Sequence, residues 1–301
     1  MTTIAFIGLG IMGRPMATHL VAAGYDVVGR DFNPASVDYL VSKGGRSADT
    51  MASAVAEADI VITMLPDSPD VEMAVLGDDG IYAHARPGIL HIDCSSIRPD
   101  VARRVAAEGE KHDIHVVDAP VSGGEVGAVE ATLSIMVGGS EEDVARALPI
   151  LTHMGGTVVH VGPKGAGQTV KAANQLIVAG TIELVAEAIV FLEAYGVQMD
   201  AAIKVLAGGL AGNQILERKA ASMLRREFSP GFRVDLHHKD MGIVTAAARE
   251  AGVAIPLGSH VASLVGSLRA QGHGGLDHSA LLLQVEQLSG RSRRSDGKPV
   301  G

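Results

Sequence analysis

The stretch Gly165–Asn174, with the sequence GAGQTVKAAN, carries the residues best suited to proton transfer. Lys171 and Asn174 are three positions apart, so on a helix both side chains project from the same face. The positive end of a helix and apolar surroundings both disfavour a cation, so we expect the pKa of Lys171 to lie below the usual value of about 10.4. A lowered pKa suits a general acid and base. The alternative is an ordinary lysine whose ammonium group reaches solvent.

A glycine-rich segment near the N-terminus has the spacing of a dinucleotide-binding loop. Thr3–Ile7 is an apolar run typical of a strand, Gly8, Gly10 and Gly13 follow as G-x-G-x-x-G, and a helical pattern begins at Pro15. The first glycine permits a tight turn, the second lets a pyrophosphate approach the backbone, and the third lets helix and strand pack closely. The residues predicted to contact the cofactor here are Gly8, Gly10, Ile11, Met12 and Gly13.

An acidic residue follows the second predicted strand, Val27–Arg30. Asp31 stands 18 residues after Gly13, where a carboxylate can accept hydrogen bonds from adenosine ribose hydroxyls. It would repel the 2′-phosphate of NADP, so the sequence favours NAD (NADH), with NADP as the second choice. Asn33 in the same turn is a further predicted cofactor contact. The alternative is that Asp31 only starts the turn Asp-Phe-Asn-Pro.

Strands and helices alternate along the first half of the chain, which predicts an α/β fold with a doubly wound sheet of the Rossmann type. Residues that follow strand carboxyl ends line the cofactor crevice of such a sheet. Met64, Leu65 and Pro66 are in this position, and so is Ser96. The expected strands are Thr3–Ile7, Val27–Arg30, Ile60–Leu65, Ile89–Asp93, His115–Val117, Ser134–Val137 and Thr157–His160, and the expected helices are 15–23, 34–43, 51–56, one from Ser68, 99–111 and 141–152.

The segment Asp118–Gly124, DAPVSGG, lies between two of these strands. Its Ser122, Gly123 and Gly124 can present a hydroxyl and successive backbone N–H groups to a small anion such as a substrate carboxylate. The alternative is a plain glycine turn.

A long helix is predicted from Thr169 to Ala194, because this stretch has no proline and Gly180 as its one glycine. It would be roughly 40 Å long and would belong to two domains or two subunits. Apolar residues on nearly every face predict a buried helix. Glu183, Glu187 and Glu193 interrupt any run that could cross a bilayer, so we expect no membrane association.

Beyond the long helix the strand pattern stops. Residues 1–163 are predicted to form the dinucleotide-binding domain and residues 164–290 an all-helical substrate and oligomerisation domain, joined through the long interdomain helix. The remaining helices are expected near 200–207, 213–226, 234–251, 258–270 and 277–288. Residues 291–301 are polar and are predicted to be a disordered tail.

The pair His237-His238 invites a metal interpretation, but adjacent histidines cannot share one helical face and no matching ligands stand out. We therefore expect no metal site. Lys239 is the better candidate for a cofactor or substrate contact, with Asp240 as its neighbour on the helix surface.

Composition limits the partners of the chain. With 301 residues and 47% hydrophobic content, about two domains with real cores are expected. A net charge of -9 without a basic block argues against nucleic acid and anionic membranes. The single cysteine, Cys94, excludes an internal disulfide and suits a reducing cytoplasm. No targeting signal is visible at the N-terminus.

Four segments in this order resemble the β-hydroxyacid dehydrogenase family. They are Phe6–Ala17 (FIGLGIMGRPMA), Asp118–Gly124, Gly165–Asn174 and Lys239-Asp240, and the resemblance extends to about Gly290. It implies that Lys171 is the catalytic acid and base, that Asn174 and the Ser122–Gly124 backbone bind substrate, and that Ser96 and Lys239 lie near the nicotinamide. It also implies homodimers or homotetramers assembled through the long helix.

Within this family the pair Asn174-Gln175 looks like the branch that reduces tartronate semialdehyde to D-glycerate, with Gln175 as a substrate contact. The segments Gly231–His237 and Asp277–Leu281 favour the same branch. The first alternative is oxidation of 3-hydroxyisobutyrate or of another short β-hydroxyacid. A remote alternative is a dinucleotide-binding module without catalysis, which the presence of both Lys171 and Asn174 opposes.

Overall fold

The computed structural model describes residues 1–291 and separates into two compact units, Met1–Lys171 and the part of the chain from Ala172 onward. The predicted disordered tail lies, apart from Arg291, outside the described residues.

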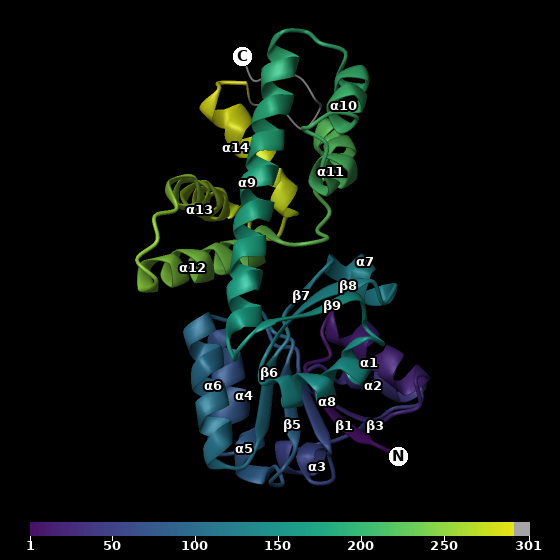
Figure 1. The fold of residues 1–301 in the computed structure, drawn as a ribbon. Helices are drawn as coiled ribbons and strands as arrows, with labels where there is room; N and C mark the ends of the chain where they lie inside the picture. Colours follow the sequence, from purple (N-terminus) through teal and green to yellow (C-terminus); the bar gives the residue numbers. More distant parts are fainter. Residues whose placement is uncertain (292–301) are drawn as a thin grey trace. The chain divides into compact units, whose positions relative to one another are not determined.

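A mostly parallel sheet forms the centre of the first unit (Figure 1). The strand order is β3-β2-β1-β4-β5-β6-β8-β7, and β9 pairs with β8. The strands from β3 to β6 in this order run parallel, whereas β8 is antiparallel to β6 and to β7. The strands are β1 (Thr3–Ile7), β2 (Asp26–Arg30), β3 (Arg46–Ser47), β4 (Ile60–Thr63), β5 (Leu90–Asp93), β6 (His115–Asp118), β7 (Val121–Ser122), β8 (Leu133–Gly138) and β9 (Gly155–Gly162).

Helices cover both faces of this sheet, so the predicted doubly wound fold is confirmed (Figure 1). One face packs on α1 (Gly13–Ala22), α2 (Pro34–Ser42) and α8 (Glu141–Leu151). The other packs on α3 (Met51–Val55), α4 (Ser68–Leu76), α5 (Ile81–His84) and α6 (Pro99–Lys111). The sequence did not predict the short elements β3, β7, α5 and α7 (Gly124–Val129).

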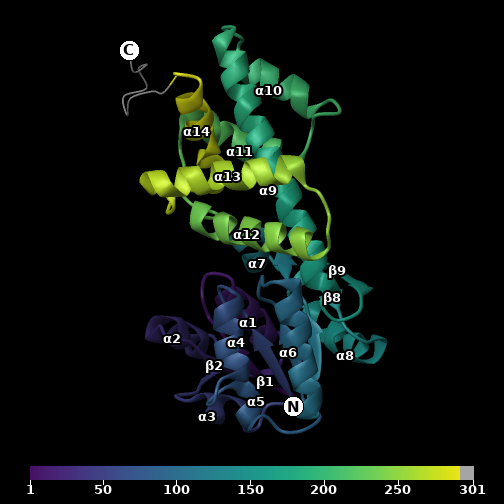
Figure 2. The same ribbon diagram turned by 90° about the vertical axis from the view of Figure 1, so that its left-hand side faces the viewer.

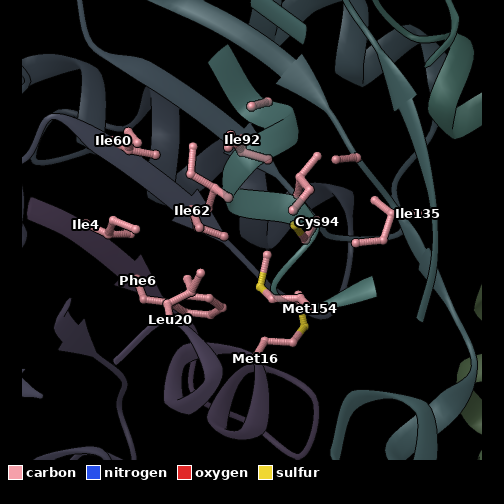
Figure 3. Packing of buried hydrophobic residues seen from close by; sticks show 14 of the residues in the cluster. Ile4, Phe6, Met16, Leu20, Ile60, Ile62, Ile92, Cys94, Ile135 and Met154 are labelled. Carbon is pink, nitrogen blue, oxygen red and sulfur yellow. The ribbon is translucent and has the colours of Figure 1, made fainter. Parts of the chain in front are cut away.

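The alternation of side chains along the strands builds two separate cores. In β1, Ile4 and Phe6 belong to the core under α1, whereas Ala5 and Ile7 belong to the core on the opposite face. Figure 3 shows Phe6 beside Leu20, and Cys94 within the same core. Burial raises the pKa of the Cys94 thiol, so this cysteine is a packing residue and not a reactive one.

The second unit is built from helices around the C-terminal part of α9 (Ala166–Ala194), as predicted. Figure 2 shows α12 and α13 side by side, and their residues are in contact. Gly258 lets α13 approach α9, because a Cβ there would lie too close to the end of the Leu176 side chain. The helices are α10 (Met199–Ala207), α11 (Gln214–Arg225), α12 (Val234–Glu250), α13 (Pro256–Leu268) and α14 (Leu281–Leu288).

Two predicted helices of this unit end or begin differently in the structure. The helix expected at 258–270 changes at Arg269 into a π-helical turn that ends at His273, because Gly272 adopts a positive φ of 90°. The helix expected at 277–288 begins as a 3-10 turn, because the Asp277 carboxylate accepts the Ser279 N–H and caps it.

The long helix α9 begins at Ala166, three residues before the predicted start. By length and hydropathy alone it could cross a membrane, but Ile182, Ala186 and Ile189 are fully buried in the core of the second unit. The prediction that α9 is buried on nearly every face was wrong for one row of side chains. Ile177, Leu184 and Phe191 are 67%, 54% and 62% exposed and form one stripe.

Candidate active site

The glycine-rich loop after β1 has the shape that a dinucleotide phosphate needs. Gly8 has a φ of 95°, and a side chain there would clash with the Met64 carbonyl. At Gly13 a side chain would clash with the Gly8 carbonyl, so helix α1 packs directly on the loop. A Cβ at Gly10 would meet nothing within 4 Å, so its direction is open to a ligand. Ile11 is exposed and Met12 is the N-cap of α1, so the positive end of this helix lies at the loop.

Asp31 lies at the carboxyl end of β2, beside this loop. One carboxylate oxygen accepts the Leu9 N–H at 2.6 Å, and the other accepts the Asn33 N–H at 2.7 Å. Each oxygen retains a second lone pair that a ribose hydroxyl could use. The Asn33 side chain is exposed and caps α2 by accepting the Ala35 N–H. Arg30 turns to Asp49, whose carbonyl oxygen it contacts at 3.2 Å.

The loops after β4 and β5 lie at the same edge of the sheet as the loop after β1, because β4 runs parallel to β1 and β5 runs parallel to β4. This edge between β1 and β4 is where the strand order changes direction, which is the usual ligand crevice of such a sheet. The Leu65 N–H donates to Ser95 Oγ at 2.9 Å and ties the two loops together. The other predicted contacts in these loops are Met64 and Ser96, which are half-buried, and Pro66, which is exposed.

Lys171 is only 8% exposed, and its ammonium Nζ donates to the Val121 carbonyl oxygen at 2.7 Å. Val121 directly precedes Ser122, so the structure brings the predicted acid and base next to the predicted anion-binding segment. Gly123 and Gly124 have φ values of 140° and 66°, a conformation that favours glycine. They lead into the short helix α7, which the sequence did not predict.

Asp118, at the start of the same segment, holds the beginning of α9. Its carboxylate accepts the N–H groups of Gly165 at 2.7 Å and of Gln168 at 2.9 Å. Burial, with the negative charge of Asp93 as a smaller contribution, raises the pKa of Asp118 to about 6, although the two N–H donors act in the opposite direction. The sequence singled out this segment for its glycines and missed the capping role of the aspartate.

The predicted contacts of the second unit form one hydrogen-bonded chain. Asn174 Nδ2 donates to Gln175 Oε1 at 2.8 Å, and Gln175 in turn donates to Asp240. Lys239 forms an ion pair with Asp240, with Nζ and Oδ1 2.8 Å apart. The prediction that Asp240 lies on the helix surface was wrong, because it is 3% exposed and connects Gln175 with Lys239.

His237 and His278 are buried, and their Nδ1 atoms are 3.0 Å apart. The pKa of His278 is lowered to about 3, mainly by burial and by the neighbouring His237. Within residues 1–291 no group of three or more His, Cys, Asp or Glu side chains has the arrangement of a metal site.

Comparisons with known proteins identify relatives of both parts of the chain. Residues 3–162 match the model of the NAD binding domain of 6-phosphogluconate dehydrogenase, and residues 165–285 match that of the NAD-binding region of NADP-dependent 3-hydroxyisobutyrate dehydrogenase. The chain is 39% identical to the 2-hydroxy-3-oxopropionate reductase of Escherichia coli over 95% of this chain and 98% of the relative. It is also 39% identical to the NAD-dependent L-serine dehydrogenase of Pseudomonas aeruginosa, over 93% of this chain and 97% of that relative.

A solved structure leads to the same family. The 3-hydroxyisobutyrate dehydrogenase of Mycobacterium tuberculosis with L-serine superimposes with a TM-score of 0.86 at 40% identity, over 94% of this chain and 98% of that one. The open space beside Gly10 leaves room for the pyrophosphate of NAD, the cofactor whose binding both domain models name. The chain therefore belongs to the β-hydroxyacid dehydrogenase family and is an NAD(P)-dependent oxidoreductase that acts on the CH–OH group of small β-hydroxyacids.

Proposed function

We propose that this enzyme reduces tartronate semialdehyde (2-hydroxy-3-oxopropanoate) to D-glycerate with NADH, and catalyses the reverse oxidation. The observation that carries the proposal is the 2.7 Å contact between Lys171 Nζ and the Val121 carbonyl. It holds a buried amine beside Ser122, Gly123 and Gly124, a segment suited to a carboxylate. A three-carbon substrate with an aldehyde at one end and a carboxylate at the other matches these two functions.

In the proposed reaction each residue has one task. When bound, the reduced nicotinamide supplies the hydride that adds to the aldehyde carbon. Lys171, as the ammonium ion, donates a proton to the carbonyl oxygen as negative charge develops there, and takes it back in the oxidation direction. Asn174, one helical turn further along α9, donates a hydrogen bond to the same oxygen. The Ser122–Gly124 backbone holds the substrate carboxylate, and Gln175 contacts the substrate hydroxyl.

We propose that the first unit holds the cofactor and that NADH is preferred over NADPH. Gly8, Gly10, Ile11, Met12 and Gly13 would surround the pyrophosphate. Asp31 and Asn33 would lie at the adenosine ribose, where the Asp31 carboxylate repels a 2′-phosphate. The remaining proposed contacts are Met64, Leu65, Pro66, Ser96 and Lys239.

The second candidate function is oxidation of 3-hydroxyisobutyrate or L-serine. It is favoured by the equal 39% identity of the chain to relatives named for all three activities. These substrates share the three-carbon β-hydroxyacid frame and differ at the carbon next to the carboxylate. A comparison of these substrates therefore tests the side chains around that carbon, and it does not test the proposed roles of Lys171 or NAD.

A substrate panel tests the proposal. Initial rates would be measured with NADH against tartronate semialdehyde and methylmalonate semialdehyde, and with NAD against D-glycerate, 3-hydroxyisobutyrate and L-serine. We expect kcat/KM for tartronate semialdehyde to exceed that for methylmalonate semialdehyde by about 10-fold or more, because the second substrate has a methyl group in place of the hydroxyl that Gln175 would contact. A reversed order would assign the enzyme to the second candidate function.

We also propose that the enzyme is a homodimer or homotetramer assembled through α9. Ile177, Leu184 and Phe191 are seven residues apart and exposed, which is the spacing of a helix-packing seam. Phe191 also borders a cavity of about 450 Å³ with Leu264 and Leu288 in its wall. Large apolar side chains that are exposed in a row along one helix are typical of an interaction site. The free, buried thiol of Cys94 supports a cytoplasmic location.

A further inference from the structure

Gln168, in the first turn of α9, is a glutamine whose amide group is fully occupied by a distant loop. It is 1% exposed. Its Nε2 donates to the Ser95 carbonyl oxygen at 2.7 Å, and its Oε1 accepts the Ile97 N–H at 3.0 Å. These two hydrogen bonds hold the backbone of the loop 95–97 on either side of Ser96, which is a proposed cofactor contact.

The loop 95–97 is itself hydrogen-bonded to the ends of the strands. The Ser95 N–H donates to Asp93 Oδ1 at 3.1 Å, and Ser95 Oγ accepts the Leu65 N–H at 2.9 Å. Gln168 therefore connects α9 to the loops after β4 and β5, which form part of the edge that suits a dinucleotide.

A second set of bonds holds the same helical turn from another direction. Asp118 accepts the backbone N–H of Gln168 at 2.9 Å, and Lys171 Nζ donates to Val121 at 2.7 Å. Lys171 is three residues after Gln168, so the two side chains leave the same face of the helix one turn apart. A shift of the helix at Gln168 would move the lysine by a similar distance.

We infer that Gln168 is a positioning residue that fixes the distance between Lys171 and the Ser95–Ile97 loop. The proton donor is thereby kept at a constant distance from the residues proposed to contact the cofactor. The inference rests on the proposed role of Lys171. A misplacement of about 1 Å between reacting groups can lower turnover by about 10²-fold, so a side chain that fixes this distance acts on kcat rather than on binding.

Two substitutions test this role. Gln168→Met keeps the length of the side chain and removes both hydrogen bonds. Gln168→Glu keeps an acceptor for the Ile97 N–H and sets a second oxygen against the Ser95 carbonyl, so it serves if the methionine variant does not fold. The matched control is Val144→Ala in α8, which opens a cavity in the core of the same unit away from the loops. Each protein would be assayed for kcat, for the Kd of NADH and for Tm.

We expect both Gln168 variants to lower kcat by about 10- to 100-fold while the Kd of NADH stays within about 3-fold of wild type. The control should lower Tm and leave kcat unchanged. A Gln168 variant that loses Tm as the control does and keeps wild-type kcat would overturn the inference, as would weaker NADH binding with unchanged kcat. If the wild type turns over no substrate of the panel, the proposed function fails first, and that result is distinct from an active wild type with active Gln168 variants.

Discussion

The Asp31 carboxylate shapes the glycine-rich loop and is also the group that we propose to select the cofactor. It accepts backbone N–H groups from Leu9 and Asn33 and so shapes the glycine-rich loop from outside. The lone pairs that remain are suited to ribose hydroxyls, and its charge opposes a phosphate. Cofactor preference and loop shape should therefore depend on the same side chain.

Replacing Asp31 with serine should reduce the preference for NADH over NADPH. The charge that repels the 2′-phosphate is lost, so we expect the ratio of kcat/KM values for NADH and NADPH to fall by about 10-fold or more. The control is Asp26→Ser, which removes the same charge at the opposite end of β2, where Asp26 pairs with Arg46. An unchanged ratio in Asp31→Ser would show that selection against NADPH lies elsewhere.

The chemistry-bearing residues could be predicted from sequence where their spacing is local. Lys171 and Asn174 share a helical face, and the glycines of residues 8–13 carry their own pattern. Gln168 and Asp240 were missed or misplaced because their partners are 65 to 73 residues away. A glutamine that binds a distant backbone has no spacing that could reveal it.

At the scale of single elements, α9 combines a buried side with an exposed apolar stripe. Its buried side includes Glu183, which is 4% exposed and whose Oε2 has no hydrogen-bond partner among the described residues. Burial, and less strongly the charge of Glu187, raises the pKa of Glu183 to about 7. The exposed apolar stripe and the buried carboxyl group of Glu183 therefore both lower the free energy of unfolding of an isolated chain.

A charge placed in the stripe should break the assembly. Leu184→Glu would bury a carboxylate in an apolar contact, so we expect light scattering after size exclusion to report the mass of a single chain. Met73→Glu is the matched control, because Met73 is a comparably exposed apolar residue on α4. The assignment of the stripe as the interface fails if Leu184→Glu keeps the wild-type mass.

Glu183 should make stability depend on pH. Its pKa is about 7 in the folded chain and near 4.5 in the unfolded chain, so the folded state retains the proton at pH values where the unfolded state has lost it. The contribution of this group to the free energy of unfolding therefore falls as pH rises from about 4.5 to 7, and remains low above that.

Glu183→Gln removes this dependence. Relative to wild type, the free energy of unfolding of the variant should rise by about 1–2 kcal/mol between pH 5 and pH 8, measured by urea unfolding at one protein concentration. Glu130→Gln, an exposed position, should show no such change. Parallel pH profiles for wild type and Glu183→Gln would mean that Glu183 ionises normally.

At the scale of the whole chain, a sheet unit with the features of a cofactor site and a helical unit are linked by one continuous helix. The alternating pattern of strands and helices predicted this architecture, because each parallel strand needs a crossover helix. The reversed direction of β8 could not be predicted, since a short apolar run has the same pattern in either orientation. The stripe on α9 was read as core for a similar reason, because apolar residues occur equally in cores and interfaces.

Cofactor binding should be separable from catalysis in the whole chain. NADH at about 100 times its Kd should stabilise wild type and Lys171→Ala alike, by about 2.7 kcal/mol. The chain has no tryptophan, so the fluorescence of NADH itself reports binding without that background. A loss of this stabilisation in Lys171→Ala would mean that the lysine supports the cofactor and not only the proton transfer.

The most direct measurement is the rate of NADH oxidation by Lys171→Ala on the semialdehyde that the wild type reduces fastest. With the proton donor removed, kcat should fall by about 10²-fold or more while the Kd of NADH stays within about 3-fold. Lys164→Ala, which removes a lysine that pairs with Glu110, should keep wild-type turnover. Wild-type kcat in Lys171→Ala would contradict the assignment of Lys171 as the acid and base.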